Sequence, residues 1–313
     1  MMKNTALRLL RRNLNLCNSV AASGHGAGNG MMRAPGPCVG VSRCVLLNRS
    51  YSTDAPHLLP SSSDDVYVVS GCARGIGMEF ALQLLSRTQG SVVGLCRNPD
   101  SSGVAKLIRD YPERFSAIEM DLTDQNSIEE AGRRVAGMHD RVSLLLNVSG
   151  VLGDGVNHPG PERKLASIDR SWLHSTLDIN LIGHVMVTRE MQRLLKGDRK
   201  TGKLAKVASL SARVGSIQDN RLGGWYSYRV SKAALNQFTK TVSLELSRQR
   251  CVAIALHPGT VDTDLSVPFQ KNVSPGKLFS PTRSVSDMLD VVWNCSLEDT
   301  GKLYAYDGSI IPW

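Results

Sequence analysis

Short apolar segments with the composition of β-strands alternate with segments of helical periodicity along most of this chain. The strand-like segments are 66–70, 91–96, 115–120, 142–147, 206–211 and 252–257. Helical spacing of apolar residues is found at 75–86, at roughly 168–195, near 226–246 and at 284–293. This alternation predicts a parallel sheet covered by helices on both faces. The expected fold class is α/β, a single-domain, doubly wound sheet of the Rossmann type without an internal repeat.

A cluster of glycines joins the first predicted strand to the first predicted helix. Residues 70–77 read Ser-Gly-Cys-Ala-Arg-Gly-Ile-Gly, which places Gly71, Gly75 and Gly77 in the spacing G-x-x-x-G-x-G. Glycine permits a tight turn and lets backbone N–H groups approach a pyrophosphate at a helix N-terminus. A glycine turn alone is often only a turn, but its place between a strand and a helix favours a dinucleotide site.

The end of the second predicted strand indicates which dinucleotide is bound. An NAD site usually carries Asp or Glu there, to bind the ribose diol. Residues 95–98 read Leu-Cys-Arg-Asn and contain no acid. Arg97 would pair with a 2′-phosphate, and Arg74 in the glycine turn would assist, although either side chain is also compatible with a plain surface charge. The sequence therefore predicts NADP(H) in preference to NAD(H).

Tyr228 and Lys232 lie four residues apart in the predicted helix near 226–246, so they share one helix face. A phenol with a pKa near 10 is a poor acid–base catalyst at neutral pH. A neighbouring ammonium favours the phenolate and is expected to lower that pKa. Such a pair is common by chance, and it gains weight only together with the glycine turn.

These two motifs together make residues 64–313 resemble the short-chain dehydrogenase/reductase family. Four further segments carry the resemblance in chain order: Asn147-Val148-Ser149-Gly150, Asp178-Ile179-Asn180, Ser209-Leu210-Ser211 and His257-Pro258-Gly259-Thr260-Val261-Asp262-Thr263. Within the family, residues 210–217, 223–229, 264–279 and the end of the chain are similar to C-factor-like and Sniffer-like carbonyl reductases.

The resemblance implies a role for each of four catalytic residues. Tyr228 would exchange a proton with the carbonyl oxygen, and Ser211 would hydrogen-bond that oxygen and stabilise developing charge. Lys232 would lower the tyrosine pKa and hold the nicotinamide ribose. Asn180 would support a water-linked proton path to Lys232. The expected reaction is hydride transfer between the nicotinamide and a small-molecule carbonyl or alcohol.

Two of these assignments have alternatives within the sequence. Ser211 lies 17 residues before Tyr228, farther than the family's usual spacing, and position 212 is Ala. Ser209 therefore stays open as the catalytic serine. Tyr226 is a second candidate phenol, but it lies six residues before Lys232 and hence on another helix face.

The matched motifs imply a set of cofactor-binding residues. They are Gly71, Arg74, Gly75, Ile76, Gly77, Arg97, Asp121, Leu122, Asn147, Gly150, Tyr228, Lys232, Pro258, Gly259, Val261 and Thr263. Asp121, at the end of the third strand, would meet the adenine, and its alternative role is to cap the chain near Asp124. No metal ligands are predicted, since the cysteines of the body are far apart and form no C-x-x-C pair.

The net charge of +9 is concentrated at the N-terminus. Residues 1–51 contain seven Lys and Arg and no Asp or Glu, which leaves 30 basic and 28 acidic residues for 52–313. This nearly neutral body argues against a nucleic-acid partner. The acid-free, partly amphipathic segment predicts an organelle transit peptide over 1–51, a linker over 52–63 and the domain over 64–313. Arg49-Ser50-Tyr51-Ser52 resembles a mitochondrial cleavage site and favours the matrix; a plastid address and a plain basic tail are the alternatives.

The sequence also limits the possible partners. The uncharged run 13–32 is broken by Gly and Asn, so no integral membrane segment is expected. A homo-oligomer is an expectation by family analogy alone. The competing function is that of a catalytically silent dinucleotide-binding protein with a regulatory or signalling role.

Overall fold

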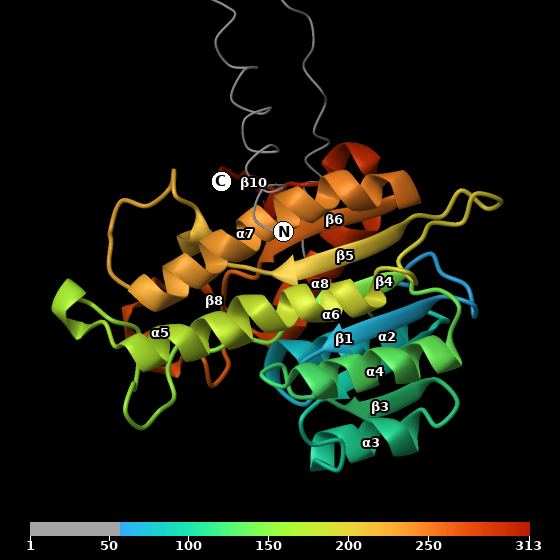
Figure 1. Ribbon diagram of the computed structural model, residues 1–313, viewed down its shortest axis with the longest axis horizontal. Helices are drawn as coiled ribbons and strands as arrows, with labels where there is room; N and C mark the ends of the chain where they lie inside the picture. Colours follow the sequence, from blue (N-terminus) through green and yellow to red (C-terminus); the bar gives the residue numbers. More distant parts are fainter. Residues whose placement is uncertain (1–56) are drawn as a thin grey trace, which may run out of the picture. The chain divides into compact units, whose positions relative to one another are not determined.

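The computed structural model describes residues 57–313, and an eight-stranded sheet runs through this part of the chain (Figure 1). The strands lie in the order β10-β9-β6-β5-β4-β1-β2-β3. They are β1 (Val66–Ser70), β2 (Ser91–Cys96), β3 (Phe115–Glu119), β4 (Leu144–Asn147), β5 (Ala205–Leu210), β6 (Cys251–His257), β9 (Leu303–Ala305) and β10 (Ile310–Ile311). All pairings are parallel except that of β10 with β9, so the sheet is mostly parallel with one antiparallel edge.

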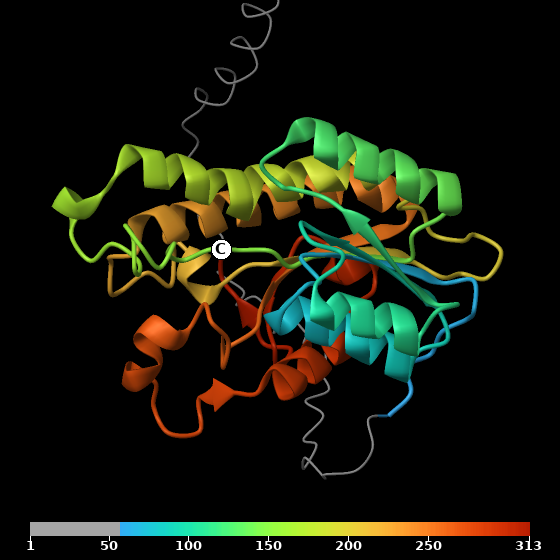
Figure 2. The ribbon, with the colours of Figure 1, turned by 90° about the horizontal axis from the view of Figure 1, so that it is seen from below.

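Helices cover both faces of this sheet (Figure 2). One face carries α2 (Gly75–Arg87), α3 (Ser102–Asp110) and α8 (Pro281–Asn294). The other carries α4 (Gln125–Met138), α5 (Arg170–Leu177), α6 (Gly183–Met191) and α7 (Tyr226–Leu246). Each helix layer buries its own cluster of apolar side chains against the strands. The predicted α/β, doubly wound Rossmann-type fold with helices on both faces is confirmed.

The predicted long helix at 168–195 is interrupted in the structure. A π-helical turn at Asp178–Ile182 joins α5 to α6, and it contains Asn180. Single π turns of this kind are frequent at functional sites because they redirect side chains within an otherwise regular helix. The apolar pattern does not predict α3, α4, β9 or β10, which the structure contains.

The direction of the strand order changes between β1 and β4. From β1 the chain first builds outward through β2 and β3, and it then returns to place β4 on the other side of β1. Ser70 at the end of β1 pairs with Asn147 at the end of β4. In open α/β sheets, ligands bind at this switch point, where the loops leaving two neighbouring strands diverge.

The predicted presequence, 1–51, lies outside the described residues and stays a prediction. Only residues 57–63 of the predicted linker are described, and they pack on the domain. Leu59 is 5% exposed, and its N–H donates to the carbonyl oxygen of Arg87. The indole of Trp293 donates to the carbonyl oxygen of Pro60. Leu59 and Pro60 of the predicted linker thus contact the domain.

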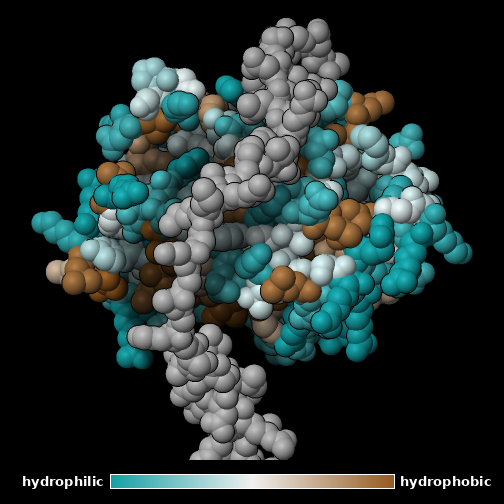
Figure 3. Space-filling model, turned by 90° about the horizontal axis from the view of Figure 1, so that it is seen from above, coloured by the Kyte–Doolittle hydropathy of each residue, from teal (hydrophilic) through white to brown (hydrophobic). Residues whose placement is uncertain are grey.

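Within residues 57–313, no helix combines the length and apolar character that a membrane span requires. On the face shown in Figure 3, apolar residues form small groups separated by hydrophilic ones.

Candidate active site

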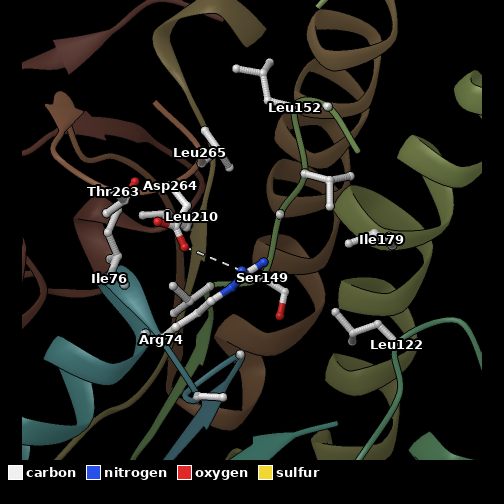
Figure 4. Close-up of a pocket in the computed structure, with 18 of the residues that line it drawn as sticks. Arg74, Ile76, Leu122, Ser149, Leu152, Ile179, Leu210, Thr263, Asp264 and Leu265 are labelled. Atoms are coloured by element: carbon white, nitrogen blue, oxygen red, sulfur yellow. Dashed lines mark ion pairs between the residues drawn. The ribbon is translucent and has the colours of Figure 1, made fainter. Parts of the chain in front are cut away.

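A cleft of about 550 Å³ lies at the switch point, beyond the carboxyl ends of the parallel strands. The glycine turn, the ends of β2 to β5, α7 and the loop after β6 contribute to its walls. Figure 4 shows Arg74 reaching across this cleft toward Asp264, with Leu152 and Leu265 at one end and Leu122 at the side. A dinucleotide site in this position agrees with the sequence prediction.

The glycine turn has the conformation that the sequence predicts. Gly71 and Gly75 have φ angles of 91° and 54°, which favour glycine. A Cβ atom on Gly77 would collide with the carbonyl oxygen of Gly71, so the start of α2 packs directly against the turn. The first turn of α2 has neither an acidic residue nor a side-chain cap. Its N–H groups are therefore suited to a phosphate.

Two arginines contribute positive charge to this end of the cleft. Arg97, exposed and directly after β2, lines the cleft at the position where an NAD site usually carries an acid, and Asp121 is close enough to feel its charge. Arg74 also lines it, but its guanidinium lies 3.6 Å from the carboxylate of Asp264. Both partners of that ion pair are largely exposed, so the pair is weak and Arg74 is free to exchange it for a phosphate.

Asp121 and Leu122 line the cleft beside β3, as predicted. The carboxylate of Asp121 accepts hydrogen bonds from the N–H and hydroxyl of Thr123, both at 2.8 Å. The backbone hydrogen bond from Thr123 is the main cause that lowers the pKa of Asp121. The alternative role, capping α4, belongs to Asp124, whose carboxylate accepts from the N–H of Asn126.

Tyr228 and Lys232 both line the cleft from the first turns of α7. The Lys232 ammonium nitrogen lies 5.7 Å from the centroid of the Tyr228 ring and donates to the carbonyl oxygen of Leu210 at 2.7 Å. Burial raises the pKa of Tyr228 to about 12 and lowers that of Lys232 to about 7. The pKa of Tyr228 is therefore raised and not lowered as the motif predicts, because the loss of solvation outweighs the effect of the Lys232 ammonium.

Ser211 lies next to this pair and lines the cleft, whereas Ser209 does not. Ser209 is buried in the sheet, 3.5 Å from the amide nitrogen of Asn147. The hydroxyl of Ser211 donates to Oδ1 of Asn236 at 2.6 Å, and the amide nitrogen of Asn236 donates to the carbonyl oxygen of Gly215. Between the two serines, the geometry favours Ser211.

Asn180 is fully buried in the π-helical turn and contacts Val151, which lines the cleft. Its amide accepts from the N–H of Val151 at 2.7 Å and donates to the carbonyl oxygen of Val151 at 2.9 Å. It also donates to Ser231, whose hydroxyl donates to the carbonyl oxygen of Tyr228. Asn180 thereby ties a cleft wall to α7.

Some predicted residues lie elsewhere. Asn147, expected at the cofactor, is fully buried in the sheet and donates to the hydroxyl of Thr188, because its strand position points it into the core. Gly259 and Val261 line a neighbouring pocket and not the main cleft. Tyr226 lines neither. The other predicted cofactor residues line the cleft: Gly71, Arg74, Gly75, Ile76, Gly77, Arg97, Asp121, Leu122, Gly150, Tyr228, Lys232, Pro258 and Thr263.

The neighbouring pocket has a volume of about 170 Å³ and shares Ser211 and Tyr228 with the main cleft. Its walls are largely apolar and include Trp225 and Phe269, whose ring centroids are 5.2 Å apart. The Trp225 ring also meets the Tyr228 ring edge-on at 6.2 Å. The two candidate catalytic hydroxyls thus lie where a dinucleotide-sized cleft joins a small apolar pocket.

Trp225, Phe269 and Asn236 go beyond the residues that the sequence predicts for the site. A usable signal exists only for Asn236, which follows Tyr228 and Lys232 at intervals of four along one helix face. Trp225 lines the pocket and has a left-handed backbone conformation, with φ at 56°, and side-chain patterns reveal neither feature.

The amino-acid sequence is similar to those of known proteins. A family model described as short chain dehydrogenase matches residues 65–274. An uncharacterized oxidoreductase of Schizosaccharomyces pombe is 30% identical over 262 residues, which are 80% of this chain and 99% of that protein. The C-signal protein of Myxococcus xanthus is 35% identical over 172 residues, which are 55% of this chain and 93% of that protein.

Solved structures show the same likeness. An NADPH-bound carbonyl reductase from chicken fatty liver superposes with a TM-score of 0.70 at 27% identity, covering 80% of this chain and 99% of that one. Carbonyl reductase Sniffer of D. melanogaster gives a TM-score of 0.69 at 24% identity, with 80% and 100% covered, and its likeness concerns the fold.

The chain therefore belongs to the short-chain dehydrogenase family, a family of oxidoreductases. The predicted resemblance to C-factor-like proteins and to carbonyl reductases is confirmed by the C-signal protein and the chicken reductase, and the likeness to Sniffer is one of fold.

Proposed function

We propose that this protein is an NADP(H)-dependent carbonyl reductase that transfers hydride between the nicotinamide and a small carbonyl or alcohol. The observation that carries the proposal is the position of Tyr228 and Ser211 where the cleft meets the apolar pocket. A carbonyl group bound there would have its apolar substituent in the pocket and its oxygen beside two hydroxyls.

The residues of the cleft fit NADP(H). The uncapped start of α2 suits the pyrophosphate, and Arg97 with Arg74 suits the 2′-phosphate. When bound, the nicotinamide supplies the hydride. The NADPH-bound chicken reductase and an NADP-bound short-chain dehydrogenase/reductase of Burkholderia multivorans support this choice.

In the reducing direction, Tyr228 would donate its phenolic proton to the carbonyl oxygen as that oxygen gains charge. Its raised pKa keeps the proton on the phenol until then. Ser211 would hydrogen-bond the same oxygen, and to donate it must turn its proton away from Asn236. Asn180 holds Val151 and, through Ser231, the backbone of Tyr228.

The test is a carbonyl screen with the purified protein. We expect it to oxidise NADPH in the presence of aldehydes or ketones, with slower turnover of NADH. A second candidate, a silent dinucleotide-binding signalling protein, is favoured by the likeness to the C-signal protein. Tight NADPH binding without turnover of any carbonyl in the screen would favour this second function.

We further propose that residues 1–51 direct the protein to the mitochondrial matrix, on the strength of their basic, acid-free composition. Fused to a fluorescent protein, this segment should give mitochondrial fluorescence. The imported fusion should be smaller by the mass of residues 1–51, because the segment is cleaved off. Replacing its arginines by glutamine should abolish the targeting. Plastid or diffuse fluorescence of the unaltered fusion would contradict the proposal.

A further inference from the structure

The helix that carries Tyr228 lacks a cap of its own. The residue before α7 is Trp225, which makes no side-chain capping bond and has left-handed backbone angles of 56° and 43°. The first turn of α7 contains Ser227 and Tyr228. Backbone N–H groups in a first helical turn have no acceptor within the helix and need one from elsewhere.

Glu162, which lies 65 residues before Ser227, supplies an acceptor for one of these N–H groups. Its carboxylate accepts from the N–H of Ser227 at 3.2 Å and, through a short hydrogen bond, from the Ser227 hydroxyl. Its backbone carbonyl oxygen accepts from the N–H of Trp225 at 2.5 Å. Glu162 therefore fixes the residue immediately before Tyr228 and also the aromatic residue that lines the apolar pocket.

The Glu162 side chain is in an environment that requires such partners. The residue is only 7% exposed, and no ion pair among residues 57–313 includes it. Burying a carboxylate is costly unless hydrogen bonds or positive charge compensate. The N-terminus of α7 provides both, through its N–H groups and the positive end of the helix dipole.

Glu162 also belongs to a segment that reaches the ligand cleft. Gly153, Asp154, Gly155, Pro159 and Gly160 line the cleft from the same stretch of chain. Glu162 thus follows directly in the chain on a segment that lines the cleft, and it also caps the helix that carries Tyr228.

We propose that Glu162 is a positioning residue for Tyr228. Its carboxylate anchors the first turn of α7 to the segment that lines the cleft, and this contact sets the place of the phenol relative to bound cofactor and substrate. The inference rests on the proposed function in so far as Tyr228 is the proton donor, but the anchoring itself can be measured without turnover.

The experiment compares three variants of the full chain: Glu162→Ala, Glu162→Gln and, as a control, Ser280→Ala. Ser280 caps α8 through the N–H of Arg283, and no residue of α8 lines the cleft or the pocket. All three variants are measured for kcat and KM with the best carbonyl of the screen and for the Kd of NADPH. Hydrogen exchange over residues 222–232 reports the order of the first turn of α7.

We expect Glu162→Ala to lower kcat by about 10- to 100-fold, because small displacements of a catalytic group have effects of this size. The Kd of NADPH should stay within about 2-fold, and exchange over 222–232 should become faster. Glu162→Gln keeps an acceptor oxygen of the same reach and should restore kcat to within about 3-fold of the unaltered protein. Ser280→Ala should lose stability without changing kcat or the exchange of 222–232.

The inference is overturned if Glu162→Ala leaves kcat unchanged, if Ser280→Ala lowers kcat equally, or if exchange over 222–232 is the same in all variants. If the unaltered protein turns over no carbonyl, the proposed function fails and exchange alone decides. Faster exchange in Glu162→Ala and not in Ser280→Ala would then still support the anchoring, and unchanged exchange would refute it.

Discussion

At the nucleotide end of the cleft, the functional groups come from short continuous segments. The glycine turn 71–77 and Arg97 each follow directly from one strand of the sheet. At the substrate end, Trp225, Phe269 and Glu162 come from separate segments and meet only in the folded protein. A dinucleotide can be bound by local backbone geometry, whereas a pocket for a small molecule needs walls from several directions.

Tyr228 lies where the two ends meet, and its removal should have the largest effect. Tyr228→Phe keeps the ring but deletes the proton donor, so kcat for carbonyl reduction should fall by about 10²- to 10⁴-fold. The Kd of NADPH, measured by fluorescence titration, should change little. Tyr226→Phe is the matched control, because Tyr226 lines neither the cleft nor the pocket. Turnover that survives Tyr228→Phe would contradict the catalytic assignment.

Arg97 tests the nucleotide end by itself. Arg97→Ala should raise the Kd of NADPH by about 10- to 100-fold, because a charge-assisted bond to the 2′-phosphate is lost. The Kd of NADH should change much less. Arg109→Ala removes a surface charge outside the cleft and serves as the control. If the Kd values of NADPH and NADH rise by the same factor, Arg97 does not bind the 2′-phosphate.

Trp225 tests the substrate end by itself. Trp225→Leu removes an aromatic wall of the apolar pocket, so kcat/KM for an aryl aldehyde should fall by about 10-fold. A two-carbon aldehyde, which is too small to reach the wall, provides the internal control. NADPH binding should not change. If both aldehydes lose the same factor, Trp225 acts through Tyr228 and not as a wall of the pocket.

Replacing Lys232 should give an effect of a different kind, a change in how the free energy of unfolding depends on pH. Burial lowers its pKa from the ordinary 10.5 to about 7, so between these values the unfolded chain binds more protons than the folded one. Lys232 therefore makes stability rise as pH rises through this range. Lys232→Met should flatten that rise in urea unfolding at pH 7 and pH 9, without cofactor. Lys240→Met, an exposed lysine of the same helix, should leave the slope in place; a slope kept in both variants would contradict the assignment.

The α/β class, the glycine turn and the shared helix face of Tyr228 and Lys232 could all be predicted from the sequence. All three depend on local periodicity or on the backbone freedom of glycine, and a few consecutive residues are enough to recognise either. Three outcomes needed the folded structure: Asn147 lies in the core, Ser211 rather than Ser209 lines the cleft, and Asn236 accepts the hydrogen bond of the Ser211 hydroxyl. Those outcomes depend on which way a side chain points once strands and helices have packed. Glu162 shows the reason most clearly, since its partner lies 65 residues away and no local pattern encodes that contact.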